Sequence, residues 1–369
     1  SAESDRNFNR PPAGQTVAMG IIRILLVADT HLGFDLPLRP RIRRRRRGPE
    51  FFTNFVRALK PALKGDVDAV VHGGDVLYRS KVPARLVAMA FEPLKQVAET
   101  GVPVYLVPGN HERSAIPHGH LAKHPGIHLF DRPRTFTLQT KQGSLALAGF
   151  PFVRTAVRKN FLNWVAQTGW PKQGADIHIL CVHQSLDGAT VGPVGYTFRY
   201  AHDVIRTADI PPAFAAVLAG HIHRFQVLTK DLKGRLLKTP VFYPGSIERT
   251  SFAEKDEPKG YLVLEFETSK RPTAGLKAWT FHELPTRPMV QLELHAAGMN
   301  AARIQSWIQS SLYQISPDSI VKLKVHGKLS TEAMAVFRAP ALRSLAPQSM
   351  NIDAALVDYF VYAKRRKKI

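Results

Sequence analysis

The sequence predicts a layered α/β fold followed by a second, smaller α/β module. From residue 21 onward, short apolar runs rich in β-branched residues alternate with longer stretches of helical spacing. This is the pattern of strands and helices packed in layers. The alternation restarts after Pro285 and Pro288, where a new unit is expected to begin. Because 369 residues are more than one core usually organises, two folded units are the expected arrangement.

The first unit is expected to span residues 21–284. Its strands are predicted where apolar runs are bounded by turn residues, at 22–28, 69–72, 104–108, 145–150, 177–182, 215–219, 239–243 and 260–267. Two helices are predicted from apolar residues at helical spacing, one over 51–63 and one over 86–97. Such apolar faces ordinarily pack against a sheet, which gives the layers of the predicted fold.

The second unit is expected at residues 285–340. A strand at 290–294, a helix at 301–312 and a strand at 319–325 form a small β-α-β module. The stretch 331–363 has weaker periodicity, interrupted by Pro340 and Pro347, and is predicted as mixed helix and loop. We therefore treat 341–369 as a carboxyl-terminal segment with a basic tail, and the polar residues 1–20 as a disordered amino-terminal tail.

The charge of the chain predicts a polyanionic partner. There are 51 Lys and Arg residues against 29 Asp and Glu residues, a net charge of +22 that is more than solubility requires. Seven arginines fall within nine residues, at Arg39, Arg41, Arg43, Arg44, Arg45, Arg46 and Arg47. A second basic cluster lies at 364–368. Nucleic acid is the first candidate. The alternatives are an adaptation of the host proteome, an acidic membrane surface or, for the arginine run, a solvated loop.

The sequence shows no pattern of export or membrane insertion. No apolar run approaches the length of a bilayer-spanning helix, and residues 1–20 lack the pattern of a signal peptide. Cys181 is the one cysteine and lies in an apolar run, where a small buried hydrophobe in a reducing compartment is expected. We expect a cytoplasmic protein that does not associate with a membrane.

Polar residues of metal-ligand type follow the predicted strands again and again. The residues that come directly after five of the apolar runs are Asp29 and His31, Asp75, Asn110 with His111 and Glu112, His183, and His221 with His223. Because the carboxyl ends of strands in an α/β sheet lie along one edge, these groups are expected to converge although they are distant in sequence. The sequence therefore predicts a site at that edge.

The ligand types predict which ions the site would hold. Asp, Asn and His without thiolate suit manganese, iron or zinc rather than a structural zinc knot. The chain offers too many ligands for one ion. Two cations roughly 3.5 to 4 Å apart, bridged by a carboxylate, would clamp a phosphate oxygen during in-line displacement. The expected chemistry is hydrolysis of a phosphate ester.

The ordered set of motifs, Asp-x-His, Gly-Asp, Gly-Asn-His-Glu, a lone His and Gly-His-x-His, resembles that of the calcineurin-like metallophosphoesterases over residues 21–250. The chain also resembles the SbcD-type DNA double-strand-break repair nucleases, through Asp29-Thr30-His31-Leu32-Gly33 and through Tyr243-Pro244-Gly245-Ser246 followed by Arg249-Thr250-Ser251-Phe252. The resemblance implies a metallophosphoesterase β-sandwich flanked by helices, with a small α/β DNA-capping domain. Tyr78, where relatives often place His or Asp, departs from the pattern.

The resemblance also implies roles for the site residues. Asp29, His31 and His223 would bind one ion, Asn110, His183 and His221 the other, and Asp75 would bridge the two. Manganese is the expected metal, with iron or zinc as alternatives. His111 would not bind metal but would help the leaving group depart, a task that suits imidazole because it titrates near neutral pH. Glu112 is expected to support the ligands without binding metal.

The function expected from the resemblance is that of a two-metal-dependent phosphodiesterase acting on DNA as a repair exonuclease or endonuclease. The arginine run Arg43–Arg47 would contact DNA phosphates without reading sequence. A homodimer and an SbcC-type ABC ATPase partner are also expected. The alternatives are a metallophosphatase or cyclic-nucleotide phosphodiesterase acting on a small substrate, or a DNA-tethering subunit whose catalysis is secondary.

Two other groups of residues attract notice without predicting a site. His118, His120, His124 and His128 are expected as surface histidines rather than as a further metal site, since prolines and glycines separate them. Phe161, Trp164 and Trp170 are expected to pack a helix onto a sheet, although aromatic residues at this spacing could also stack on bases.

Overall fold

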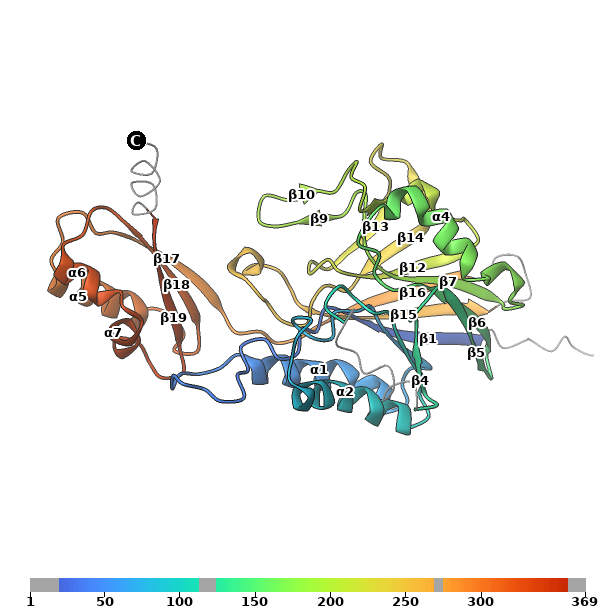
Figure 1. Cartoon of the computed structure of the whole chain (residues 1–369), viewed down its shortest axis with the longest axis horizontal. Coiled ribbons are helices and arrows are strands. Elements are labelled where there is room, and N and C mark those ends of the chain that lie inside the picture. The colour runs from blue at the N-terminus through green and yellow to red at the C-terminus, as the bar shows by residue number, and fades with distance from the viewer. Residues whose placement is uncertain (1–19, 113–123, 269–274, 358–369) are drawn as a thin grey trace, which may run out of the picture.

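A computed structural model describes residues 20–112, 124–268 and 275–357 in two units, a larger one and a smaller one (Figure 1). Residues 1–19, His118, His120 and the basic cluster at 364–368 lie outside the described residues. Among the described helices, none has the length and apolar character needed to cross a membrane.

Two six-stranded sheets form the larger unit. The order in the first is β16-β15-β1-β2-β3-β4, with β1 (Gly20–Val27), β2 (Ala69–His72), β3 (Val104–Leu106), β4 (Ile127–Leu129), β15 (Gly260–Thr268) and β16 (Gly275–Glu283). The order in the second is β13-β14-β12-β7-β6-β5, with β5 (Arg134–Thr140), β6 (Gly143–Gly149), β7 (Ile177–His183), β12 (Phe214–Gly220), β13 (Gln226–Lys230) and β14 (Leu236–Tyr243).

The two sheets pack face to face and carry helices on their outer faces. Between the sheets lies a core that includes Ile24, Leu26, Ile179 and Leu218. Helices α1 (Gly48–Leu63) and α2 (Ala84–Glu99) cover the first sheet, and α4 (Val157–Gln167) packs on the second. Figure 1 shows this order of layers, with α1 and α2 below the sheets and α4 above them. The predicted layered α/β sandwich is confirmed.

The helices follow from local sequence. Pro49 suits the first turn of α1 because its fixed φ favours the helix and the missing N–H needs no partner there. Along α1, Phe51, Phe55 and Leu59 recur at helical spacing and are fully buried. In α4, Phe161 is buried and Trp164 packs beside it on the second sheet, as expected for these aromatic residues.

Parallel strands bring several chain segments to one edge. In the first sheet β1, β2 and β3 run parallel, and in the second β7 runs parallel to β12, which runs parallel to β14. The 3₁₀ turn η1 (Trp170–Lys172) precedes β7. Short elements follow β7 and β14: β8 (Ser185–Leu186), β9 (Thr190–Val191), β10 (Tyr196–Thr197), β11 (Val204–Ile205) and the 3₁₀ turns η2 (Thr207–Asp209) and η3 (Phe252–Glu254). The carboxyl ends of the parallel strands carry the predicted ligands.

The smaller unit is a three-stranded parallel sheet with helices on it. The strands are β17 (Met289–His295), β18 (Ile320–His326) and β19 (Asn351–Leu356), and the helices are α5 (Ala301–Tyr313), α6 (Thr331–Val336) and α7 (Ala339–Ser344). Asn300 caps α5 by accepting a hydrogen bond from the N–H of Arg303 at 2.9 Å.

The strand β19 differs from the sequence prediction. Residues 331–363 were expected as mixed helix and loop, and α6 and α7 fit that description, but residues 351–356 form a strand. The segment Asn351–Leu356 alternates weakly on its own, and its extended shape depends on pairing along the whole of β18. The sheet of the smaller unit therefore continues beyond residue 340, where the sequence had placed the boundary.

Candidate metal centre

The loops that follow β1, β2, β3, β7 and β12 meet where the two sheets face each other. Asp29, His31, Asp75 and His221 have φ angles of 51°, 43°, 53° and 93°. Residues other than glycine rarely adopt this left-handed region, and such conformations cluster at functional sites. Backbone hydrogen bonds hold the turns together, since Asp29 N–H donates to Gly74 O at 2.9 Å and His31 N–H to Asp75 O at 3.0 Å.

The predicted ligands converge in two groups. Asp29, His31 and His223 each place one ligand atom within 4.8 Å of the others, and so do Asp75, His183 and His221. Asn110 belongs with the second group, because its Oδ1 atom lies 3.1 Å from His183 Nε2 and 3.2 Å from His221 Nδ1.

The hydrogen bonds behind these histidines test whether the site fits a divalent cation. His183 Nδ1 lies 2.7 Å from Gly73 O, and His223 Nδ1 lies 3.1 Å from Glu254 Oε1. Both acceptors favour a ring proton on Nδ1, so Nε2 is the nitrogen that would bind a metal ion at the centre. His31 Nε2 approaches His223 Nε2 to 2.9 Å. Lone pairs and carboxylates that converge in this way fit divalent metal ions.

A model of the calcineurin-like phosphoesterase family matches residues 22–225, which contain all seven predicted ligands. The chain belongs to this family. It is 29% identical over 282 residues to the DNA double-strand break repair protein Mre11 of Haloferax volcanii, covering 75% of this chain and 55% of that protein. It is 25% identical over 289 residues to the protein of the same name from Aeropyrum pernix, covering 74% of this chain and 63% of that protein.

The chain thus spans between half and two thirds of the length of these curated relatives. Among solved structures, a dimetal phosphatase from Danio rerio is similar with a TM-score of 0.43 and 12% sequence identity. That similarity covers 71% of this chain and 98% of the phosphatase.

Burial keeps two histidines of this calcineurin-like phosphoesterase neutral. Burial, and then the neighbouring His223, lower the pKa of His31 to about 3. Burial, and then His183, lower the pKa of His221 to about 3. At neutral pH both rings are therefore uncharged, and each offers a lone pair.

The carboxylates of Asp29 and Asp75 give the centre a negative electrostatic potential, which favours a bound cation. Burial raises the pKa of Asp29 to about 6. Burial also opposes the ionisation of Asp75, but His183 and the other nearby histidines hold the pKa of Asp75 well below its usual range. Burial opposes the charging of His183 as well, yet Asp75 and Asp29 raise its pKa to about 9. A field that draws a proton onto His183 would also favour a metal ion there.

His111 lies beside the ligands but is more exposed than most of them. Its main-chain N–H donates to Asp75 Oδ1 at 3.0 Å, and its ring Nδ1 lies 3.1 Å from Leu77 O. The side chain is 30% exposed, and Nδ1 lies 3.8 Å from Asp75 Oδ2. His31, Asp75 and His111 also place ligand atoms within 4.8 Å of one another. A role without metal contact therefore stays a prediction.

Glu112 is fully buried and supports the loops that carry the ligands. Its Oε2 atom accepts from Asp75 N at 2.8 Å and from Gly109 N at 2.9 Å, and its Oε1 atom accepts from Leu77 N at 2.9 Å. Burial, and then Asp75, raise the pKa of Glu112 to about 8. Its contacts fit the expected supporting role.

Three residues near the centre were not predicted from the sequence. Phe152 places its ring 5.5 Å from that of His221 and 5.9 Å from that of His183. Glu254 contacts His223, and the buried Lys259 contacts Glu254 at 2.7 Å. The nearness of Glu254 to the motif that ends at Phe252 was the one available signal.

Most of the arginine run lies against the protein itself. Arg44 and Arg46 pair with Asp35 at 2.7 and 3.1 Å. Arg45 pairs with Asp318 in the smaller unit, and its Nη1 atom donates to Ser349 O at 3.0 Å.

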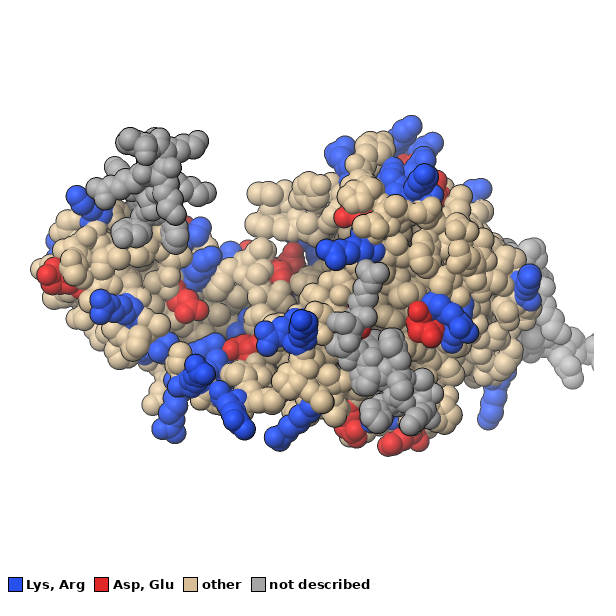
Figure 2. Space-filling view, in the orientation of Figure 1, with Lys and Arg blue, Asp and Glu red and all other residues tan. Residues whose placement is uncertain are grey.

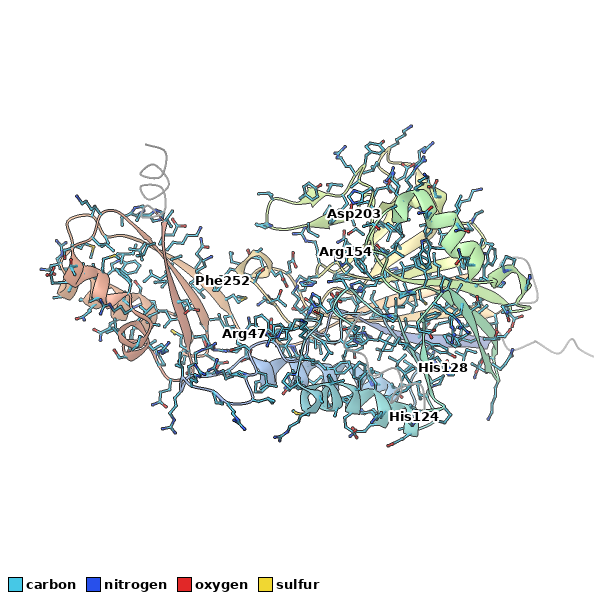
Figure 3. All side chains as sticks on the ribbon, viewed as in Figure 1. Arg47, His124, His128, Arg154, Asp203 and Phe252 are labelled. Atoms are coloured by element: carbon cyan, nitrogen blue, oxygen red, sulfur yellow. The ribbon has the colours of Figure 1, made fainter. Side chains whose placement is uncertain are left out.

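Two further arginines complete the run. Arg47 is buried, donates to Arg249 O at 2.7 Å and lies at the junction between the two units (Figure 3). Arg43 is exposed and has no hydrogen bond or ion pair within the described part of the chain. DNA contact by Arg43–Arg47 stays a prediction; within this run Arg43 and Arg44 are exposed, and so are Arg39 and Arg41, which precede it.

His128 and Tyr78 pack against aromatic neighbours away from the candidate ligands. His128 lies in β4 and is half-buried, with its ring stacked on Tyr105 at 4.8 Å. It is therefore not a plain surface residue, because β4 is packed against β3. Tyr78 meets Phe34 edge-on at 6.1 Å and lies under Arg79. Neither residue contacts the candidate ligands within the described residues.

Proposed function

We propose that this chain is a two-metal-dependent nuclease that hydrolyses phosphodiester bonds of DNA in double-strand-break repair. The observation that carries the proposal is the cluster of seven Asp, Asn and His side chains at the meeting point of the two sheets. The relatives named for DNA double-strand break repair support DNA as the substrate. The net charge of +22 supports a polyanionic substrate in the same way.

The proposal assigns a place to each ligand. Asp29, His31 and His223 would hold one ion, Asn110, His183 and His221 the other, and Asp75 would contact both. When bound, the ions would activate water and neutralise charge on the phosphate. Manganese is the metal we propose, with iron or zinc as alternatives that share the preference for nitrogen and oxygen ligands.

His111 is the proposed catalytic residue. With Nδ1 held near Leu77 O, its other ring nitrogen is available on the exposed side to donate a proton to the leaving 3′-oxygen. Glu112 would keep Asp75 and His111 in register by accepting the N–H groups of the loops that carry them. The backbone hydrogen bond from His111 to Asp75 ties the proton donor to the ligand.

The experiment that tests this function compares substrates in the presence of manganese. Linear duplex DNA, circular single strands and small phosphodiesters are offered in parallel, and we expect DNA to be cleaved. Because a circle has no ends, cleavage of the circle would identify an endonuclease. Hydrolysis of the small phosphodiester alone would contradict the proposal and favour a metallophosphatase or cyclic-nucleotide phosphodiesterase.

We also propose that the chain acts in the cytoplasm as a homodimer bound to an SbcC-type ABC ATPase. On helices α1 and α2 the inner faces are buried in the core, while Val56, Leu63 and Met89 are 43%, 37% and 41% exposed. These three side chains are the exposed large apolar residues that the two helices offer for pairing. Light scattering at micromolar concentration tests the dimer, and a monomeric mass with and without DNA would contradict it.

A further inference from the structure

His223 differs from His183 in what holds its ring. The Nδ1 atom of His183 meets a main-chain oxygen, that of Gly73, whereas the Nδ1 atom of His223 meets the side chain of Glu254. The side chain of His223 is 30% exposed, whereas that of His183 is fully buried. Thr250 Oγ1 lies farther from the same Nδ1 atom, at 3.4 Å, so Glu254 is the nearest partner that can orient the outer side of the His223 ring.

Glu254 is itself fixed through both carboxylate oxygens. It ends η3, which begins at Phe252 on the side of the larger unit that faces the smaller one (Figure 3). Its Oε1 atom accepts from Thr250 Oγ1 at 2.6 Å and from Ser251 Oγ at 3.4 Å, and its Oε2 atom lies 2.7 Å from Lys259 Nζ. Because several donors share this carboxylate, it has little freedom to turn away from His223.

Lys259 is a fully buried ammonium with three partners. Besides Glu254, its Nζ atom lies 3.1 Å from Glu257 Oε2 and donates to the main-chain oxygen of His223 at 2.9 Å. Glu257 in turn accepts from Arg224 Nε at 2.9 Å. A buried ammonium is costly unless it is paired and hydrogen-bonded. Each partner of Lys259 is His223 itself or contacts His223 or its neighbour Arg224. Lys259 therefore fastens both the backbone of His223 and the carboxylate that orients its ring.

A carboxylate beside the outer nitrogen of a ligating histidine fixes its tautomer and makes the inner nitrogen a better donor. We propose that Glu254 and Lys259 are positioning residues for the ion held by Asp29, His31 and His223, and that they act on that ion alone. This inference rests on the proposed two-ion site. Within the described residues, neither side chain contacts Asn110, His183 or His221, which would hold the other ion.

The first test counts ions. Glu254→Gln removes the charge at nearly constant shape, and Glu248→Gln is its matched control. Glu248 is also a buried glutamate, bonded to Arg249 N at 2.8 Å, but it contacts none of the candidate ligands within the described residues. With manganese, we expect two ions per chain in the parent and in Glu248→Gln. In Glu254→Gln we expect one tight ion and an affinity for the other that is lower by roughly 10- to 100-fold.

Two spectroscopic readouts do not depend on activity. Electron paramagnetic resonance should show a coupled manganese pair in the parent and an isolated ion in Glu254→Gln. Without metal, nitrogen NMR should find the proton of His223 on Nδ1 in the parent and shared between both ring nitrogens in Glu254→Gln. Lys259→Met should show the same ion loss, because Glu254 would lose its ammonium partner.

Thermal melting first establishes that each variant is folded. If Glu254→Gln is not, Glu254→Asp takes its place, since it keeps the charge but shortens the reach, and the loss should fall on the same ion. Two ions at parental affinity in a folded Glu254 variant would overturn the inference, as would equal losses in Glu248→Gln. A parent chain that binds no divalent ion would overturn the two-ion proposal as well, and the tautomer of His223 would then decide whether Glu254 sets the ring.

Discussion

Charged and polar side chains gather at the candidate metal centre and at the junction between the two units. The two places differ in whether positive and negative side chains of the chain pair with each other. At the metal centre, Asp and His side chains converge, and within the described residues no Lys or Arg side chain pairs with them. At the junction between the units, Arg45, Arg47 and Arg287 meet Glu50, Asp318 and Glu248 together with main-chain oxygens. Figure 2 shows Lys and Arg side chains along this face of both units.

Arg287 has several hydrogen-bond partners at the junction. Its side chain is 7% exposed, and it donates to Glu50 Oε1 on α1 at 2.8 Å, to Asn351 Oδ1 on β19 at 2.7 Å and to Ser349 O at 2.8 Å. The arginines at the junction already have acidic partners within the chain, and we call the junction closed in this sense. The Asp and His side chains at the centre have no such cationic partner among the described residues, and we call the centre open to an added cation. Carboxylates occur in both places: at the junction they pair with arginines of the chain, and at the centre they lie among histidines.

The largest effect is expected at the open site. Asp75→Ala removes the carboxylate that we propose contacts both ions, so we expect metal content to collapse. Phosphodiester turnover should fall by roughly four orders of magnitude or more, as for the loss of a residue on which a whole catalytic unit depends. Elemental analysis and an assay with excess manganese measure both. If a folded Asp75→Ala variant kept the parental metal content, the centre would not bind cations through Asp75, and the contrast drawn with the junction would be wrong.

A smaller loss is expected at the edge of that site. His111→Ala should keep its metal and lose turnover by roughly two to four orders of magnitude, the range for a general acid. The two measurements are again metal content and turnover, now made side by side with Asp75→Ala. Equal metal depletion in both variants would show that His111 is a ligand.

At the closed junction the expected effect falls on stability. Arg287→Met removes a nearly buried guanidinium that donates to Glu50, Asn351 and Ser349, so we expect the free energy of unfolding to fall by about 1–3 kcal/mol. Hydrolysis of a small phosphodiester should be unchanged. Denaturant unfolding measures the difference, and Arg235→Met is the control, because Arg235 is exposed and, among the described residues, its side chain pairs with Asp231 alone. An equally small change in both variants would mean that the junction is not closed by charge.

The smallest effect is expected where arginines are free. Replacing Arg39, Arg41 and Arg43 by Ala should lower the slope of log affinity for duplex DNA against log salt by roughly two to three units, if each neutralises one phosphate. Replacing Arg44 and Arg46, which pair with Asp35, should lower the slope by less. Filter binding across a salt series measures both. Identical slopes in the two variants and the parent would remove the DNA role of this segment.

The sequence located the predicted ligands because each directly follows an apolar run. Asp29 and Asp75 could be placed without a structure, since β1 and β2 are buried strands with near-continuous apolar sequence. Strands at or near the sheet edges were harder. β5 and β16 are largely exposed or half-buried, and their residues carry little periodic signal.

Residues whose role depends on distant partners could not be placed. Lys259 lies in a polar, charged stretch that is typical of a surface loop, and only the fold buries it. Arg45 stands in a run of like charge that is typical of a free loop, yet its partner Asp318 comes from the other unit. Sequence patterns report local burial, whereas these pairings arise from tertiary contact.

The position of β1 in its sheet has a consequence for synthesis of the chain. β1 lies between β2 and β15, and its residue Ile22 pairs with Phe266, about 240 residues later. At roughly 5–20 residues per second, a ribosome needs about 12–50 seconds to cover that distance. During this time one edge of a largely apolar strand has no hydrogen-bonding neighbour. An edge of that kind recruits other strands, so the nascent chain is expected to need shielding until β15 emerges.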